Sequence, residues 1–210
     1  MTTGRFITLE GGEGVGKSTL AAGLQASLEA CGLAVVRTRE PGGSPGADEI
    51  RRLVVTGSKD RWSGLTESLL LTAARNDHLE RTIRPALGRG AWVICDRFTD
   101  STYAYQVVAR GLPTMTFAAL NQIIDAPIPD LTLVLDLAPG VGLARARSRA
   151  DAEARYESFE ENFHVRVRQA FLDIAAREPD RCAVVDAMAD AASVLAAARR
   201  LVAERLGVAA

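Results

Sequence analysis

The sequence is poor in several residue types that mark specialised classes of protein. Its 210 residues include 5% aromatics and three cysteines, and 25 basic against 26 acidic side chains leave a formal net charge of −1. Cys31, Cys95 and Cys182 are widely spaced and form no CxxC pair, which excludes a zinc ribbon or a disulfide framework. We expect all three to be small buried hydrophobic residues in a reducing compartment. The balanced charge argues against a polybasic nucleic-acid binder.

Long apolar runs are also missing. No stretch approaches 18 uncharged apolar residues, and the N-terminal MTTGRFITLEGG lacks the pattern of a signal peptide. The hydrophobic share of 48%, with almost no net charge, is too high for a disordered chain. The length favours a single domain spanning residues 1–210. These features predict a cytoplasmic globular protein without a nucleic-acid or membrane partner.

Two hydrophobic periodicities alternate along the chain. Segments between the apolar runs have helical spacing, as at Leu20, Leu24 and Leu28, and a helix that begins near Glu157 would contain a structural His164. This alternation predicts an α/β protein with three layers, in which helices flank a parallel five-stranded sheet. The expected strands are unbroken apolar runs, as buried parallel strands should be: residues 6–9, 34–36, 92–95, 131–135 and 182–185.

Polar clusters directly follow three of these runs. They span residues 10–19, 39–43 and 96–106. Ligands of open parallel sheets bind beyond the carboxyl ends of the strands, so the three clusters are expected to build one site.

The first cluster contains a phosphate-binding loop. Residues 11–18 fit the pattern G-x-x-x-x-G-K-[ST], with a predicted strand before it and a helix after it. Glycines let backbone N–H groups turn toward an anion, and the helix N-terminus adds positive charge. The pattern predicts a P-loop NTPase fold, but it serves kinases, switches and motor ATPases alike. The expected ATP-binding residues are Gly11, Gly12, Glu13, Gly14, Val15, Gly16, Lys17, Ser18 and Thr19.

The other clusters suit a second anion. Asp96 ends a strand as a magnesium-binding carboxylate does, and the neighbouring Arg97 can grip a phosphate in bidentate fashion. The turn 40–43 can bring backbone against a ligand. An arginine-rich stretch follows later in the chain, and it is either a solvated helix or a movable segment that neutralises a transferring phosphoryl group. Its arginines are Arg145, Arg147, Arg149 and Arg155.

Taken together, these motifs resemble those of bacterial thymidylate kinases. The segments that carry the resemblance, in order and spacing along nearly the whole chain, are 11–19, 38–43 (TREPGG), 73–75, 96–98, 101–106 (STxAYQ) and 155–157. The TREPGG segment with DRx(6)AYQ is far more specific than the phosphate loop. The resemblance implies transfer of the γ-phosphoryl of ATP to dTMP with Mg²⁺, in dTTP synthesis, by a homodimer.

The resemblance also implies roles for individual residues. Lys17 and Ser18 would serve ATP and Mg²⁺, with Asp96 near the metal, and Arg97 would hold the dTMP phosphate. Glu13 would lie near that phosphate and the sugar 3′-hydroxyl. The remaining substrate-side residues would be Glu40, Arg51, Leu71, Arg75 facing the base carbonyl, Thr102 and Gln106 at the ring edge, and Tyr105 under the deoxyribose.

Three positions set this chain apart within that family. One subtype has an arginine where this chain has Gly14, so the chain resembles the other subtype, in which a lid at about 145–156 supplies a catalytic arginine; we assign Arg149. Leu71 replaces an aromatic that stacks on thymine, and residues 107–109 (VVA) replace a glycine run. Two alternatives remain open from the sequence: a kinase of another nucleoside monophosphate, and a P-loop switch.

Overall fold

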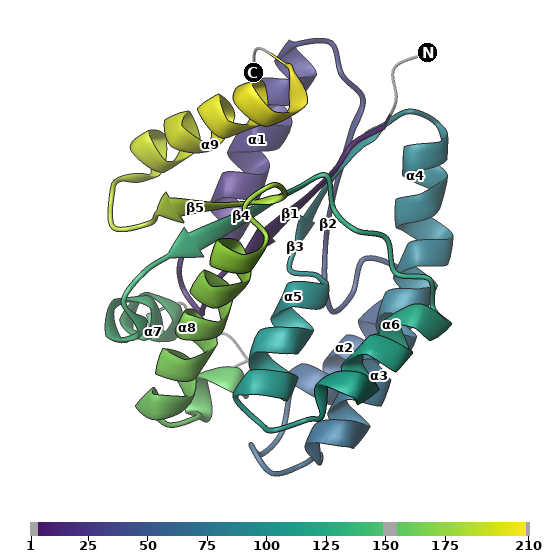
Figure 1. The fold of residues 1–210 in the computed structure, drawn as a ribbon, viewed down its shortest axis with the longest axis vertical. Helices are drawn as coiled ribbons and strands as arrows, with labels where there is room; N and C mark the ends of the chain where they lie inside the picture. Colours follow the sequence, from purple (N-terminus) through teal and green to yellow (C-terminus); the bar gives the residue numbers. More distant parts are fainter. Residues whose placement is uncertain (1–3, 149–154, 209–210) are drawn as a thin grey trace.

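A computed structural model describes residues 4–148 and 155–208, and within them the predicted sheet is confirmed (Figure 1). All five strands run parallel, in the order β2-β3-β1-β4-β5. Each continues past the apolar run that predicted it, because the polar residue after the run still pairs with its neighbour. The strands are β1 Phe6–Glu10, β2 Val35–Arg39, β3 Trp92–Asp96, β4 Leu131–Asp136 and β5 Cys182–Asp186.

Helices cover both faces of this sheet, which confirms the three layers. Helices α1 (Lys17–Ala30) and α9 (Ala191–Leu206) pack together on one face, while α4 (Arg84–Gly88) and α8 (Glu161–Arg177) contact the other (Figure 1). The remaining helical elements are α2 Pro45–Val55, α3 Gly64–His78, η1 Leu79–Ile83, α5 Thr99–Thr102, η2 Tyr103–Val108, α6 Thr114–Ile123, α7 Pro139–Arg147 and η3 Tyr156–Ser158.

The core is divided by the alternation of side chains along the strands. Ile7 and Leu9 of β1 point into a cluster with α1 and α9, whereas Phe6 points to the opposite face among Leu79 and Ile83. A third cluster joins α8 and η2. Because each face of the sheet is buried, the register of the strands is strongly specified.

Two expectations about single residues are corrected. Cys95 and Cys182 are buried as predicted, but Cys31 is exposed, since α1 ends at Ala30 and Cys31 lies in the cap that follows. Helix α8 begins at Glu161 rather than near Glu157, after the short turn η3. His164 is nevertheless buried in α8, with its ring edge-on to Phe163 at 5.4 Å. Across 4–148 and 155–208, no helix is long and apolar enough to span a membrane.

Glu10 joins the end of β1 to the turn after β3. Its side chain is fully buried. Oε1 accepts from the backbone N–H groups of Phe98 and Ser101, and Oε2 lies 2.6 Å from Ser101 Oγ. Burial, together with the negative charge of Asp100, raises the pKa of Glu10 to about 8 despite these hydrogen bonds and the nearby Arg97. Glu10 therefore keeps its proton at neutral pH while it holds residues 97–101 in place.

The raised pKa of Glu10 predicts a pH-dependent term in stability. The folded protein binds this proton up to about pH 8, whereas the unfolded chain releases it near its ordinary value of 4.5. The stabilisation is therefore complete below about pH 4.5 and is lost as the pH rises toward 8, with a slope of at most about 1.4 kcal/mol per pH unit. Glu10→Gln is neutral at every pH and can keep the same partners. Urea unfolding from pH 5.5 to 8.5 should show wild type losing stability relative to Glu10→Gln; parallel curves would contradict the assignment.

Candidate active site

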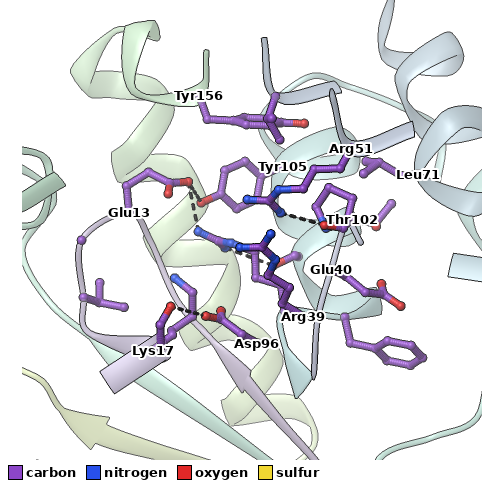
Figure 2. A pocket seen from close by; sticks show the side chains of 18 of the residues that line it. Glu13, Lys17, Arg39, Glu40, Arg51, Leu71, Asp96, Thr102, Tyr105 and Tyr156 are labelled. Carbon is purple, nitrogen blue, oxygen red and sulfur yellow. Dashed lines mark hydrogen bonds and ion pairs between the residues drawn. The ribbon is translucent and has the colours of Figure 1, made fainter. Parts of the chain in front are cut away.

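The three polar clusters meet in one cleft, as the order of the strands predicts. Because β2, β3 and β1 are neighbours in the sheet, their carboxyl ends lie side by side. A cavity of about 450 Å³ opens there, and side chains of all three clusters line it, as do residues of α2, α3 and η3 (Figure 2). This placement is what a site for two ligands bound end to end requires.

The phosphate loop has the predicted geometry. Gly11, Gly14 and Gly16 have φ angles of 136°, 67° and 98°, a region that side chains other than glycine rarely adopt, and α1 begins at Lys17. Lys17 Nζ donates to the carbonyl oxygens of Gly12 at 2.7 Å and Gly11 at 3.2 Å. Burial, together with the positive charge of Arg97, lowers the pKa of Lys17 to about 8. The ammonium group is held at the base of the loop, where an anion would restore its usual affinity for a proton.

Ser18 and Asp96 form a pair of oxygen ligands beside the loop. The Ser18 hydroxyl donates to Asp96 Oδ2 at 2.7 Å. A hydroxyl from the start of the helix after the loop and a carboxylate from the end of a neighbouring strand are the protein ligands that Mg²⁺ takes in phosphate-loop sites, with water and phosphate oxygens completing the shell. The residues present therefore fit a magnesium ion.

Arg97 crosses from the end of β3 to the phosphate loop. Its backbone is left-handed, with φ of 71°, a strained conformation for an arginine. Nη1 donates to Gly11 O at 2.9 Å, and Nη2 donates to Glu13 Oε1 at 3.0 Å. The guanidinium also lies 5.2 Å from the centre of the Tyr105 ring. The left-handed backbone, the ion pair with Glu13 and the contact with the Tyr105 ring together orient the Arg97 side chain into the cleft rather than toward solvent.

Glu13 is the centre of this arrangement. Its Oε1 also accepts from the Tyr105 hydroxyl at 2.7 Å, so the three side chains meet at one oxygen atom (Figure 2). Burial opposes ionisation of Glu13, but the charges of Arg97 and Lys17 and the Tyr105 hydroxyl outweigh it and lower the pKa to about 2. Glu13 is thus a carboxylate at every physiological pH.

Arg75 is held on the far wall of the cleft by a buried carboxylate. Its Nε donates to Glu40 Oε2 at 2.7 Å and its Nη2 to Thr102 Oγ1 at 3.0 Å, and the guanidinium lies over the Phe98 ring. Glu40 Oε1 lies 3.1 Å from His78 Nδ1. Glu40, predicted as a substrate ligand, thus acts on Arg75 while also lining the cleft.

The remaining predicted substrate residues line the same cavity. Leu71 is buried and lines the cavity, as Thr102 does (Figure 2). Arg51 reaches in from α2 and donates through Nη1 to Pro41 O at 2.7 Å. Gln106, on η2, donates through Nε2 to Glu67 Oε1 at 2.6 Å. The structure therefore brings every predicted site residue together except Arg149, which lies outside the described residues.

The arginine-rich stretch divides into two parts with different roles. Arg145 lies on α7, and its Nη1 is 3.4 Å from Ala187 O. Arg155 is buried and donates to the carbonyl oxygens of residues 54, 58 and 59. Arg155 is therefore neither solvated nor free to move, because those carbonyls and the ion pair with Glu67 fix it in the protein interior, at the C-terminal end of the predicted lid.

Sequence reasoning overlooked one buried acidic residue behind the cleft wall. Glu67 accepts from Gln106 and from the Tyr156 hydroxyl, and pairs with Arg110 and Arg155. A signal was available: Glu67 lies on the buried face of α3 by helical spacing, four residues before Leu71 and seven before Ala74. A charged residue at such a position needs buried partners.

Comparison with known proteins agrees with this geometry. A sequence model of the family "Thymidylate kinase" matches residues 9–197. The thymidylate kinase of Caulobacter vibrioides is 54% identical over 209 residues, covering 99% of this chain and 100% of that protein. The thymidylate kinase of Ruegeria pomeroyi is 52% identical over 194 residues, covering 92% of each. The crystal structure of thymidylate kinase from Ehrlichia chaffeensis has a TM-score of 0.77 and 30% identity, covering 95% of this chain and 98% of that one. These matches confirm the resemblance drawn from the motifs and decide against the two alternatives, a P-loop switch and a kinase of another nucleoside monophosphate. The chain belongs to the thymidylate kinase family.

Proposed function

We propose that this thymidylate kinase carries out its phosphoryl transfer, from ATP to dTMP, in the cleft between the phosphate loop and the wall formed by Arg75 and Gln106. The position of Arg97 is the observation that carries the proposal. Its guanidinium touches the phosphate loop at Gly11 and Glu13 and lies over the ring of Tyr105 on the acceptor side. A group placed there lies between two phosphates that meet end to end.

The acceptor pocket has the chemistry of a pyrimidine deoxynucleotide site. Arg75 can donate to a base carbonyl while Glu40 and Thr102 hold it in place. Tyr105 forms a flat floor for the sugar that would crowd a 2′-hydroxyl. Leu71 covers the ring by dispersion, without the directionality of an aromatic stack. These features support dTMP as the acceptor.

The donor side supplies charge and a metal site. The backbone N–H groups of the phosphate loop and Lys17 would receive the ATP phosphates, and Ser18 and Asp96 would hold Mg²⁺. That ion, when bound, neutralises charge on the phosphate oxygens. We assign the lid to residues 145–156 of a single domain, with Arg149 as the arginine that closes over the donor.

The transfer itself asks little covalent chemistry of the protein. Lys17 and Arg97 place two positive charges where negative charge accumulates on the transferring group. Glu13, kept ionised, orients Arg97 and the Tyr105 hydroxyl, so the acceptor is positioned before the reaction begins. Closure of the lid would exclude water and prevent hydrolysis of ATP.

Replacing Arg97 tests this assignment directly. Arg97→Ala should lower kcat/KM for dTMP by about 10²- to 10³-fold, because the charge between the phosphates is lost. Arg166→Ala removes the same charge from an exposed position on α8 and should leave the kinetics unchanged. The measurement is coupled ADP release at varied dTMP, with melting temperature as a folding control. Wild-type dTMP kinetics in Arg97→Ala would refute the assignment.

A close contact joins the phosphate loop to α7, whose last residues begin the proposed lid. A Cβ atom on Gly142 would lie 2.3 Å from Glu13 O, and one on Gly14 would lie 1.9 Å from Gly142 O. Both glycines are therefore required for α7 to rest on the loop. An arginine at position 14 would not fit against α7 in this position, which supports assignment to the subtype whose lid carries the arginine.

Substitution of Gly142 should disturb ATP binding. Gly142→Ala forces α7 or the loop to move, so kcat/KM for ATP should fall about tenfold, although alanine favours a helix more than glycine does. Gly140→Ala, on the same helix with nothing within 4 Å of the added Cβ, is the matched control and should match wild type. Steady-state kinetics at varied ATP measure kcat/KM for both variants. Equal kcat/KM for Gly142→Ala and Gly140→Ala would show that the contact between Gly142 and the phosphate loop is dispensable.

We also propose that two copies of the chain associate through α3 and α6, which are in contact with each other. Helix α6 buries none of its residues. Leu69 is 49% exposed and Met115 85% exposed, in stripes of apolar residues spaced four apart. The stripes are Leu65, Leu69 and Ala73 on α3 and Met115, Ala119 and Ile123 on α6. Adjacent exposed apolar stripes are typical of an interface rather than a free surface.

A charge placed on this face should separate the copies. Leu69→Arg should convert a dimer into a monomer, because the guanidinium would be buried without a partner. Met188→Arg introduces the same charge on another part of the surface, at a residue that is 58% exposed, and should leave the molar mass of the dimer unchanged. Size-exclusion chromatography with light scattering measures both variants. A monomeric wild type, or a Leu69→Arg variant that stays dimeric, would overturn the proposal.

A further inference from the structure

Glu67 gathers four polar partners from two separate parts of the chain, residues 106–110 and 155–156. It lies on α3 with a side chain that is fully buried. Its Oε1 accepts from Gln106 Nε2 at 2.6 Å and from the Tyr156 hydroxyl at 3.0 Å. Its Oε2 pairs with Nη1 of Arg110 at 2.7 Å and with Nη1 of Arg155. Among these partners, Gln106 and Tyr156 also line the cleft, and Arg155 and Tyr156 lie at the C-terminal end of the proposed lid.

The charge on Glu67 follows from its partners. Arg110 and Arg155 carry guanidinium groups, which stay protonated in proteins. A carboxyl group paired with two such cations in the interior is a carboxylate, since a neutral acid would leave both cations uncompensated. A carboxylate has acceptors only. Every group within hydrogen-bond distance of Glu67 must therefore be a donor.

This requirement determines how the Gln106 amide is oriented. The two ends of a glutamine amide are usually hard to tell apart, and the assignment rests on the hydrogen-bond network. Here the network leaves one solution, with Nε2 toward Glu67 and Oε1 turned away from it. Within 4–148 and 155–208, no protein group donates to Gln106 Oε1. Because Gln106 lines the cleft, Oε1 is the acceptor available to a ligand there.

We propose that Glu67 is a positioning residue for base selection: it locks the Gln106 amide so that the cleft offers an acceptor to a pyrimidine bearing N3–H. Thymine and uracil carry that hydrogen, whereas N3 of cytosine is itself an acceptor. The inference rests on the proposed function, in which the base lies beside Gln106. Through Arg155 and Tyr156, the same carboxylate ties the base-reading side chain to the end of the lid.

Exchanging the two side chains tests this role. Glu67→Gln lets the Gln106 amide turn, so KM for dTMP should rise about tenfold and the preference for dTMP over dCMP should fall, with KM for ATP unchanged within about twofold. Gln106→Glu places two carboxylates in contact, so it should raise KM for dTMP and lower the preference for dTMP by as much as Glu67→Gln does. In the double variant E67Q/Q106E, the amide now at position 67 donates to the carboxylate now at position 106, whose other oxygen still faces the base. KM for dTMP and the preference for dTMP should return to within about threefold of wild type.

Arg110→Met separates positioning from simple stability. It breaks the same buried network but leaves Glu67 paired with Arg155 and accepting from Gln106. It should lower the melting temperature and leave KM for dTMP and the dTMP:dCMP preference at wild-type values. If Glu67→Gln does not fold, Glu67→Asp keeps the charge, withdraws the carboxylate by one methylene and should still raise KM for dTMP selectively.

Two results would overturn the inference. One is a Glu67→Gln or Glu67→Asp variant that loses melting temperature with unchanged KM and base preference. The other is a double exchange no better than Glu67→Gln alone. Either could occur in a protein whose Arg97→Ala variant loses dTMP kinase activity, so the inference and the proposed function fail separately.

Discussion

The ion pair between Arg97 and Glu13 is the contact on which the rest of the site depends. It joins the turn after β3 to the loop after β1, two strands that are neighbours in the sheet. Without it, the phosphate loop and the acceptor wall would be two separate sites at one sheet edge. In the proposed function, an acceptor phosphate would share the guanidinium with Glu13. A guanidinium has five N–H donors, so it can hold a carboxylate and a phosphate at the same time.

Buried glutamate side chains have a common role around this cleft. Glu40 holds Arg75, Glu67 holds Gln106, and Glu10 holds the backbone of residues 97–101 that carries Arg97. Each lies in a different part of the chain, and each accepts from a residue that lines the cleft. Burial of a carboxyl group is costly unless its acceptors are satisfied. Because a donor that turned away would leave a buried acceptor unsatisfied, each donor is restricted to one orientation. A pair in water has no such restriction, since water can replace the donor.

Much of this arrangement could be predicted from the sequence, because the signals are local. Unbroken apolar runs identify buried parallel strands, and a glycine-rich loop between strand and helix identifies the donor site. The geometry of parallel sheets places the three clusters at one edge, and the strand order then makes them neighbours. Glu67 and Arg155 could not be placed in this way. Their partners lie 39 and up to 101 residues away in the chain, and no spacing rule relates them. Cys31 shows the limit of periodicity as a predictor of burial. Its position continues the helical spacing of Leu20, Leu24 and Leu28, but α1 ends one residue before it.

The two kinds of prediction differ because they depend on different energies. A strand or a phosphate loop is specified by backbone conformation and by the burial of its own side chains, both encoded within about ten residues. A buried ion network is specified by which charges can neutralise one another after the fold has formed. Arg155 illustrates this: its sequence neighbours are charged and polar, as in a solvated helix, yet its guanidinium finds three carbonyls and a carboxylate in the interior. An arginine that anchors the end of the lid and an arginine that closes over a substrate are therefore indistinguishable by composition. They are separated only by the partners that the fold supplies.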